Sequence, residues 1–251
     1  MSLAIITGAS RGLGRAMAEH LAAKGVDILF TYRSRKDEAD ALIAYLAAQG
    51  RKAYGLQLDT GVASSFPAFV AQVKAVLASE FGRDDFDYLI NNAGIGGAHT
   101  PLSEVTEAQF DELMNIHFKG VLFLTQGLLP LIKDGGRILN VSTGLARFTL
   151  PGYGAYASMK GAIEVMSRYM AKELGPRGIR VNVLAPGAIE TDFGGGRVRD
   201  NAELNTFVAS QTALGRVGLP DDIGAVVTAL ISDEMGWMTA QRIEVSGGMF
   251  L

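Results

Sequence analysis

The chain has 251 residues, of which 48% are hydrophobic and 20% are charged, and its formal net charge is −3. A chain of this length and hydrophobic content can bury a large core, so we expect a single domain over residues 1–251. The balance of 23 basic against 26 acidic residues argues against nucleic acid as a partner. Because the chain contains no cysteine, disulfides, thiolate catalysis and cysteine-bound metal are excluded.

The sequence carries no recognisable targeting or membrane signal. A predicted strand begins almost at once after Met1, without a basic segment followed by an apolar signal core. The most apolar run, residues 120–132, is too short to span a bilayer and contains Gln126. The three histidines are scattered without metal-binding spacing. We therefore expect a soluble, cytoplasmic protein that binds no metal and no membrane.

Short apolar runs that suit buried parallel strands alternate with helical patterns along the chain. The predicted strands are residues 3–7, 26–32, 53–58, 88–91, 138–141, 180–184 and 243–245. The predicted helices are residues 12–24, 36–49, 64–81, 106–133, 153–174 and 221–232. This alternation implies a parallel sheet with helices on both faces. The sequence therefore predicts a single-domain α/β fold of the Rossmann type, a doubly wound parallel sheet of about seven strands.

The first predicted strand leads directly into the glycine-rich turn Thr7-Gly-Ala-Ser-Arg-Gly-Leu-Gly14, and a helical pattern follows. A dinucleotide site needs this order, in which Gly8 allows the turn, Gly12 admits the pyrophosphate and Gly14 allows close helix packing. The free N–H groups at the helix N-terminus favour the anionic phosphates. We expect this turn to contact a dinucleotide through Gly8, Ser10, Arg11, Gly12, Leu13 and Gly14.

Tyr156 and Lys160 are four residues apart in a predicted helix, so their side chains share one face. Lowering the pKa of a tyrosine from about 10 to about 7 by a nearby cation requires roughly 4 kcal/mol. The pair is a candidate general acid and base. An amphipathic helix explains the same spacing when it is considered alone, and Glu164 and Glu173 on this helix are expected to lie on a solvated face.

Four motifs occur in the order and spacing of the classical short-chain dehydrogenase/reductase family: Thr7-Gly-x-x-x-Gly-x-Gly14, Asn91-Asn-Ala-Gly94, Tyr156-x-x-x-Lys160 and Pro186-Gly187. The chain resembles this family over essentially all its residues. The resemblance implies reversible hydride transfer between a nicotinamide and a carbonyl or alcohol, in a homotetramer. Tyr156 would exchange the proton with the substrate oxygen, and Lys160 would hold the nicotinamide ribose and lower the pKa of Tyr156.

The resemblance implies two more catalytic side chains. Asn115 matches the family's helix asparagine, which helps hold a water and Lys160 in a proton relay. The family's Ser-Ser pair is Ser142-Thr143 here, and counting thirteen residues back from Tyr156 places Thr143 at the catalytic serine. The threonine methyl group restricts χ1 and fills part of the pocket, although the hydroxyl can make the same bond. Ser142 remains the fallback.

The end of the second predicted strand decides between NAD and NADP, because an acidic residue there would hold the ribose 2′-OH of NAD. Tyr32, Arg33 and Ser34 stand there instead, and Arg11 adds a second guanidinium. Two arginines can bind a 2′-phosphate, so we expect NADP(H), with NAD(H) and solvated surface arginines as the alternative. The resemblance adds further cofactor contacts, in addition to Tyr156 and Lys160: Asp59, Thr60, Asn91, Ala93, Gly94, Pro186, Gly187, Ile189 and Thr191.

The function that the sequence predicts is an NADPH-dependent carbonyl reductase with a small-molecule carbonyl or alcohol substrate. Residues 188–201 would form the substrate loop, in which Thr191–Arg199 is expected to be mobile. The alternative is a 3-oxoacyl carrier-protein reductase, which would need a basic rim for an acidic partner, with Arg177 and Arg197 as candidates. A non-catalytic NADPH-binding sensor is disfavoured, because it would not need Tyr156, Lys160 and Asn115.

Overall fold

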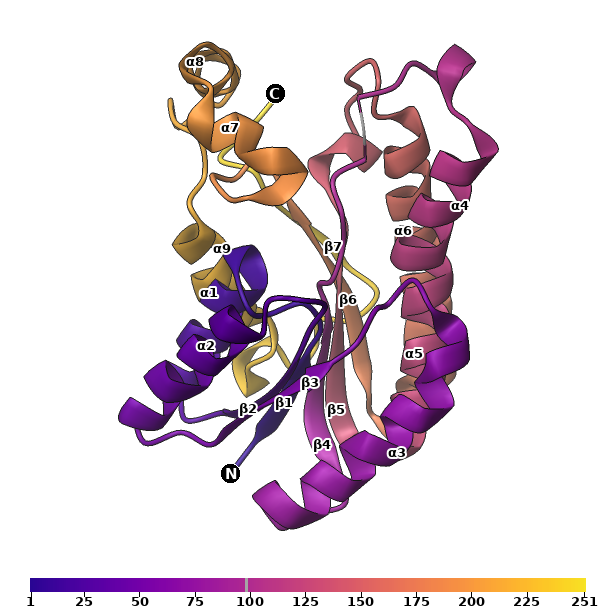
Figure 1. Ribbon diagram of the computed structural model, residues 1–251, viewed down its shortest axis with the longest axis vertical. Coiled ribbons are helices and arrows are strands. Elements are labelled where there is room, and N and C mark those ends of the chain that lie inside the picture. The colour runs from indigo at the N-terminus through magenta and orange to yellow at the C-terminus, as the bar shows by residue number, and fades with distance from the viewer. Residues whose placement is uncertain (98) are drawn as a thin grey trace.

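A parallel sheet forms the centre of the fold (Figure 1). The computed structural model describes residues 1–97 and 99–251, and within them seven strands pair in the order β3-β2-β1-β4-β5-β6-β7. All neighbouring strands are parallel. The strands are β1 (Leu3–Ile6), β2 (Asp27–Tyr32), β3 (Ala53–Gln57), β4 (Phe86–Asn91), β5 (Ile132–Val141), β6 (Arg180–Pro186) and β7 (Arg242–Val245). The predicted doubly wound parallel sheet is confirmed.

Helices cover both faces of the sheet (Figure 1). One face carries α1 (Gly12–Ala23), α2 (Lys36–Ala48) and α9 (Pro220–Leu230), and the other carries α3 (Phe66–Val76), α5 (Gly120–Leu128) and α6 (Gly154–Leu174). Ile6 packs in the core under the first layer and its neighbour Ile5 in the core under the second, because successive strand residues point to opposite faces. No helix among the described residues is long and apolar enough to cross a membrane.

The sheet reverses its strand order between β1 and β4, which is where such folds bind ligands. The carboxyl ends of these strands lie at one edge of the sheet, beside the start of α1. Three shorter helices lie beyond this edge: α4 (Glu107–Met114), α7 (Arg197–Asp200) and α8 (Ala202–Ser210). Figure 1 shows α4 on one side of this region and α7 and α8 on the other.

The structure corrects two expectations about local conformation. The helix predicted over residues 106–133 is divided into α4, a π-helical turn Asn115–Lys119 and α5, and β5 already begins at Ile132. Pairing of Ile132 with Phe86 of β4 makes this apolar end a strand. The segment Thr191–Arg199, predicted to be a mobile loop, contains a 3₁₀ turn over Phe193–Gly196 and most of α7.

Candidate active site

The glycine-rich turn between β1 and α1 is held by hydrogen bonds to the neighbouring strand ends. The Gly8 N–H donates to Thr31 Oγ1 at 3.0 Å, and the Asn92 amide donates to the carbonyl oxygens of Thr7 and Gly8 at 2.9 and 3.1 Å. A Cβ atom on Gly14 would overlap the Gly8 carbonyl oxygen, so the turn and α1 can approach this closely only with glycine there.

The N-terminus of α1 is shaped to receive an anionic group. Arg11, which precedes the helix, makes no side-chain capping hydrogen bond, so the side chain at this position leaves the first N–H groups of α1 to other partners. Gly12 has a φ of +57°, and a Cβ atom built on it would lie 3.8 Å from the Thr191 side chain. The turn therefore fits a dinucleotide pyrophosphate between α1 and the segment after β6.

The two arginines expected at the 2′-phosphate each face a carboxylate. Arg33 Nε lies 3.0 Å from Asp59 Oδ2, and Arg11 Nη1 lies 3.6 Å from Asp192 Oδ2. Both arginine side chains are more than half exposed. Exposed ion pairs of this kind stabilise a fold by at most about 1 kcal/mol, so either guanidinium can exchange its carboxylate for another anion at little cost. Ser34 is exposed in the turn after β2.

Tyr156 and Lys160 lie on the buried face of α6 and are 7% and 5% exposed. Lys160 Nζ donates to the Val141 carbonyl oxygen at 2.8 Å and lies 5.9 Å from the centre of the Tyr156 ring. Burial raises the pKa of Tyr156 above its ordinary value and lowers the pKa of Lys160 to about 8. Burial is the larger of the two influences on the Tyr156 pKa, and the Thr143 side chain opposes it. The expected lowering of this pKa by Lys160 stays a prediction.

Ser142 and Thr143 point in different directions after β5. The Thr143 hydroxyl lies beside the Tyr156 phenol and opposes the rise of its pKa, and it accepts a hydrogen bond from the Leu145 N–H at 3.3 Å. The Ser142 hydroxyl instead donates to Glu164 Oε1 at 2.7 Å. Glu164 also accepts a hydrogen bond from Arg242 Nε at 2.8 Å, so it lies in a partly buried ion pair and not on the solvated face that the sequence suggested. The structure therefore places Thr143 beside the phenol.

His117, on the π-helical turn, also lies against Tyr156. Its imidazole is fully buried and meets the Tyr156 ring edge to face, with 5.1 Å between ring centres. Burial and the nearby Lys160 charge lower the pKa of His117 to about 2, so the ring is neutral. Asn115 lies two residues earlier, and residues at that spacing on a helix do not share a face. The Asn115 amide makes no hydrogen bond to another described residue, and its expected role in a relay through a bound water stays a prediction.

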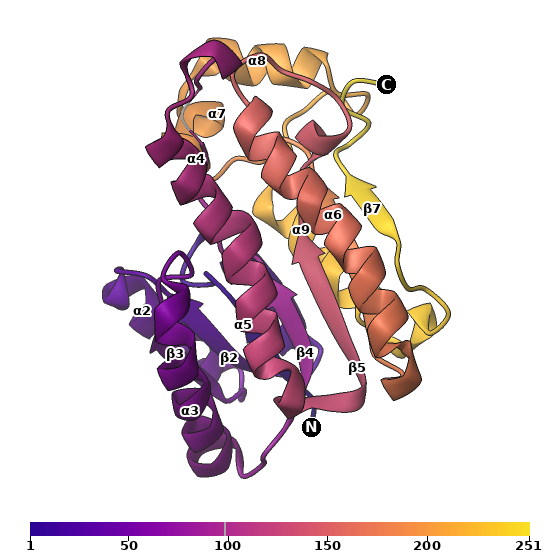
Figure 2. The same ribbon diagram turned by 90° about the vertical axis from the view of Figure 1, so that its right-hand side faces the viewer.

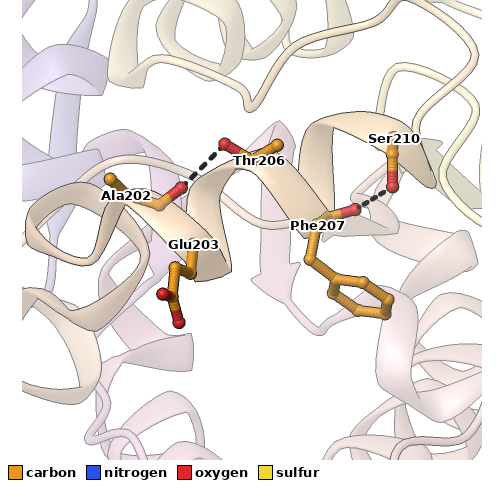
Figure 3. A pocket seen from close by; sticks show the side chains of 5 residues that line it. All are labelled: Ala202, Glu203, Thr206, Phe207 and Ser210. Atoms are coloured by element: carbon orange, nitrogen blue, oxygen red, sulfur yellow. Dashed lines mark hydrogen bonds between the residues drawn. The ribbon is translucent and has the colours of Figure 1, made fainter.

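A cavity of about 140 Å³ opens beside Tyr156. Its lining includes the backbone of Gly96 and Gly97, the side chains of Ile95 and Leu113, and polar groups from α4. A larger hollow of about 480 Å³ runs along α8 (Figure 3). The hydroxyls of Thr206 and Ser210 in this hollow bond back to carbonyl oxygens of α8 itself. Tyr156 therefore lines the smaller cavity, and the larger hollow is mostly apolar with Glu203 in its lining.

The comparisons with known proteins agree with this geometry. The family model described as enoyl-(acyl carrier protein) reductase matches residues 8–250. The reductase LugOII, described as promiscuous and as catalysing keto-reduction at C1 in lugdunomycin biosynthesis, is 36% identical, with a TM-score of 0.94 over 100% of this chain and 98% of its own. The 3-oxoacyl-[acyl-carrier-protein] reductase FabG of Staphylococcus aureus is 33% identical over 99% of this chain and 98% of its own.

The angucycline C-6 ketoreductase LanV with bound NADP is 32% identical, with a TM-score of 0.93 over 99% of this chain and 95% of its own. A second LanV structure, with NADP and rabelomycin, is 34% identical, with a TM-score of 0.89 over 99% and 96% of the two chains. The chain belongs to the short-chain dehydrogenase/reductase family. Several of its relatives in this family are ketoreductases, and the motifs described above fall within the matched residues.

In this short-chain dehydrogenase/reductase, the last residue of β4 and the residues after it make different contacts. Asn91, predicted to line the cofactor, is buried, and its amide donates to Thr125 Oγ1 and Asn140 Oδ1 at 2.9 and 2.8 Å. Its side chain therefore joins a polar network between the sheet and α5, because alternation along β4 turns it to that face. Ala93 and Gly94 lie beside the glycine-rich turn and His117 respectively. Asn92 and Thr31, which fix the turn, were not predicted as site residues.

The other predicted contacts of the short-chain dehydrogenase/reductase lie at the carboxyl edge. Asp59 Oδ1 accepts the Gly61 N–H at 2.9 Å, and the Thr60 carbonyl oxygen packs on Gly120. β6 ends at Pro186, and contacts to other elements hold the segment after it. The Gly187 N–H donates to the Val245 carbonyl oxygen at 3.0 Å. Ile189 forms a β-bridge with Gly218, and Thr191 lies beside Gly12. Among the described residues, no group of three or more metal-ligating His or carboxylate side chains comes together.

Proposed function

We propose that this short-chain dehydrogenase/reductase is an NADPH-dependent ketoreductase that reduces a ketone of a polycyclic aromatic substrate. The observation that carries the proposal is the buried Tyr156 phenol, which lies beside the Thr143 hydroxyl and lines a cavity. A general acid held in its protonated form is what carbonyl reduction requires. In the oxidation direction the same oxygen accepts the proton.

When bound, NADPH supplies the hydride that reduces the carbonyl carbon. Thr143 orients the substrate oxygen through its hydroxyl, and Tyr156 donates its proton to that oxygen as negative charge develops there. Lys160, held by the Val141 carbonyl, keeps a positive charge near the phenol at neutral pH, which favours the phenolate that proton donation leaves.

NADPH is proposed as the preferred cofactor because of the charges around the end of β2. Arg33 and Arg11 present exposed guanidiniums there, and Tyr32 stands where a carboxylate would select NAD. The NADP in the LanV structures supports the same choice. Asp59 pairs with Arg33 and not with Arg11, so its negative charge offsets only part of the positive charge of the two arginines.

The substrate class follows from the surface around Tyr156. Phe193 faces the Tyr156 ring with 6.2 Å between ring centres, and Ile95 and Leu113 line the adjacent cavity. Aromatic and apolar groups of this kind suit a flat aromatic ligand. The rabelomycin in one LanV structure and the keto-reduction ascribed to LugOII support this assignment.

An acidic carrier protein fits this surface less well. The α4 helix carries Glu107, Asp111 and Glu112 without a basic residue. In α7, Arg199 pairs with Asp192 and Asp200, which leaves Arg197 as a single basic group there. Arg177 bonds to Asp134 and to the Ile132 carbonyl, which places it at the amino end of β5, away from Tyr156. A basic rim, which would attract the acidic partner, is therefore lacking in these helices.

The test is a comparison of NADPH oxidation by the parent and by Tyr156→Phe. The substrates are a polycyclic aromatic ketone, a simple 3-oxoacyl ester and the same acyl group on a carrier protein. We expect the aromatic ketone to give the highest kcat/KM, and Tyr156→Phe to lose about 10² to 10⁴ in kcat while NADPH still binds. A Tyr156→Phe enzyme with the parent rate would exclude Tyr156 as the acid, and a preference for the carrier-bound substrate would exclude the aromatic substrate class.

A further inference from the structure

We infer that His117 is a positioning residue for this ketone reduction, in which a neutral imidazole holds both the Tyr156 ring and the backbone wall of the substrate cavity. The inference rests on the proposed function, because it names a residue that acts through the proposed general acid. His117 is absent from the catalytic set that the sequence predicted, and it is the most deeply buried titratable group of the π-helical turn.

The imidazole links two parts of the site. Its Nε2 lies 2.9 Å from the Ile95 carbonyl oxygen and 3.4 Å from the Ile95 N–H nitrogen, and Ile95 lines the cavity beside Tyr156. The same ring packs edge to face on the Tyr156 phenol at 5.1 Å. A shift of His117 would therefore move the cavity wall and the proton donor together, and misplacement of reacting groups by about 1 Å can cost about 10²-fold in rate.

The hydrogen bonds define one tautomer. The shorter contact assigns the proton to Nε2, which donates to the Ile95 carbonyl oxygen. Nδ1 is buried without a hydrogen-bond partner among the described protein atoms. An N–H group there would have no acceptor, so Nδ1 is the unprotonated nitrogen of the neutral ring. Gly94 closes this side of the ring, because a Cβ there would lie 2.7 Å from His117 Cε1.

The π-helical turn aims the side chain. Gly120 N–H donates to the Asn115 carbonyl oxygen, which is a separation of five residues in place of the usual four. One additional residue per turn rotates the following side chains relative to those of α4, and such turns recur at functional sites. His117 consequently faces α6, where Tyr156 and Lys160 are the groups that meet it. Neutrality suits this place, since an imidazolium would repel Lys160.

Two variants separate positioning from simple core packing. His117→Leu fills a similar volume but removes the hydrogen bond to Ile95. His117→Asn keeps an amide that can donate to the Ile95 carbonyl oxygen and accept from its N–H. The matched control is His20→Leu, because the partly exposed His20 bonds to the exposed Asp221 and does not line the cavity beside Tyr156.

We expect His117→Leu to lower kcat for the aromatic ketone by about 10²-fold while the Kd for NADPH stays near that of the parent. His117→Asn should recover most of the lost kcat, and His20→Leu should leave it unchanged. A folded His117→Leu with the parent kcat would overturn the inference. So would a folded His117→Asn that is as slow as His117→Leu, because the hydrogen bond to Ile95 would then be irrelevant.

An NMR measurement gives a readout that does not depend on activity. In the parent labelled with ¹⁵N-histidine, His117 should remain neutral and protonated on Nε2 from pH 5 to pH 9, whereas exposed imidazoles titrate near about 6.5. Titration of His117 near that value would overturn the inference, and this result stands even if His117→Leu does not fold. Tyr156→Phe is assayed in parallel: an active Tyr156→Phe contradicts the proposed function, whereas an inactive Tyr156→Phe with a fully active His117→Leu contradicts only the role of His117.

Discussion

Burial, more than the distance to Lys160, sets the protonation state of the Tyr156 phenol. Lys160 is itself buried, with a pKa lowered to about 8, so its charge is present at neutral pH and lost above it. Both groups therefore favour proton donation at neutral pH, and reduction should slow as the pH rises through about 8. The same lowered pKa has a consequence for stability.

Replacing Lys160 by methionine should change how stability depends on pH. Between pH 8 and 10.5 the unfolded parent keeps the Lys160 proton that the folded parent has released, so rising pH stabilises the folded parent. Below pH 8 both states are protonated and the burial cost is fully present. The free energy of unfolding of the parent relative to Lys160→Met should therefore rise by up to about 3 kcal/mol over this range. Urea denaturation of both proteins at pH 7 and pH 10 measures the gap, and an unchanged gap would contradict the lowered pKa.

The orientation of the two hydroxyls after β5 predicts unequal effects of removing them. Thr143→Ala should lower kcat/KM by about 10²-fold or more, because it removes the hydroxyl beside the phenol. Thr143→Ser should keep substantial activity, and Ser142→Ala should have a mild effect, since Glu164 retains its bond to Arg242. Steady-state kinetics, with thermal melting to verify folding, gives the comparison. An active Thr143→Ala together with an inactive, folded Ser142→Ala would assign the role to Ser142.

Arg33→Asp should shift the cofactor preference toward NADH. The change removes a partner for the 2′-phosphate and supplies an acceptor near the ribose 2′-OH, at a cost of about 1.5 to 3 kcal/mol for NADPH. The ratio of kcat/KM for NADPH to that for NADH measures the shift. Lys36→Asp is the control, because Lys36 begins α2 and pairs with Asp40. If Arg33→Asp leaves the ratio as it is in the parent, Arg33 does not read the phosphate.

At the scale of elements, β1, the glycine-rich turn and α1 behave as one unit. Gly14→Ala places a methyl group against the Gly8 carbonyl and the Asn92 amide, neither of which can move freely. We expect a loss of stability of about 1 to 3 kcal/mol and a larger loss of NADPH affinity, because the turn must open to make room. Chemical denaturation and NADPH titration check both effects. Gly175→Ala, where an added methyl group meets nothing within 4 Å, should change neither.

The sequence was sufficient for the number and order of the strands and for the glycine-rich turn, because both depend on local pattern. The apolar run of β1 and the spacing of Gly8, Gly12 and Gly14 are readable without tertiary context. The orientation of His117 cannot be read from the sequence in this way. It depends on one additional residue in the turn over Asn115–Lys119, and hydrophobic periodicity does not reveal that residue. Glu164 was similarly misplaced, because its partner Arg242 is distant in sequence.

The short helices α7 and α8 were missed for a related reason. Three successive glycines, Gly194 to Gly196, all adopt positive φ, and glycine runs usually indicate a flexible loop. In the structure these residues turn the chain into α7, and Asn201 caps α8 by accepting the Leu204 N–H at 2.8 Å. The cap was present in the sequence as a signal, but the glycines before it concealed the helix.

At the scale of the whole molecule, α5 and α6 lie side by side on one surface (Figure 2). They expose Phe123, Val165 and Tyr169. We propose that α5 and α6 pack between subunits in the homotetramer that the family resemblance implies. Isolated exposed side chains are ordinary, but large apolar groups on adjacent helices favour an interface.

Val165→Glu combined with Tyr169→Glu should therefore dissociate the assembly, because burying two carboxylates at an interface is unfavourable. Sedimentation velocity of the parent and the double variant measures the assembly. Tyr45→Glu on α2 is the control, since Tyr45 is exposed on the opposite face of the sheet. A parent that sediments as a monomer, or a double variant that sediments like the parent, would contradict this interface.

The bonds of Arg242 mean that the site is completed late in synthesis. Arg242 lies on β7 and donates to the Thr143 carbonyl oxygen at 3.1 Å and to Glu164 at 2.8 Å, so it braces the hydroxyl pair nearly a hundred residues upstream. A ribosome-bound chain that ends before residue 242 can already possess the glycine-rich turn, Tyr156 and Lys160. It still lacks the strand that holds Thr143 in place. The backbone at Thr143 therefore acquires this contact only once β7 has paired with β6.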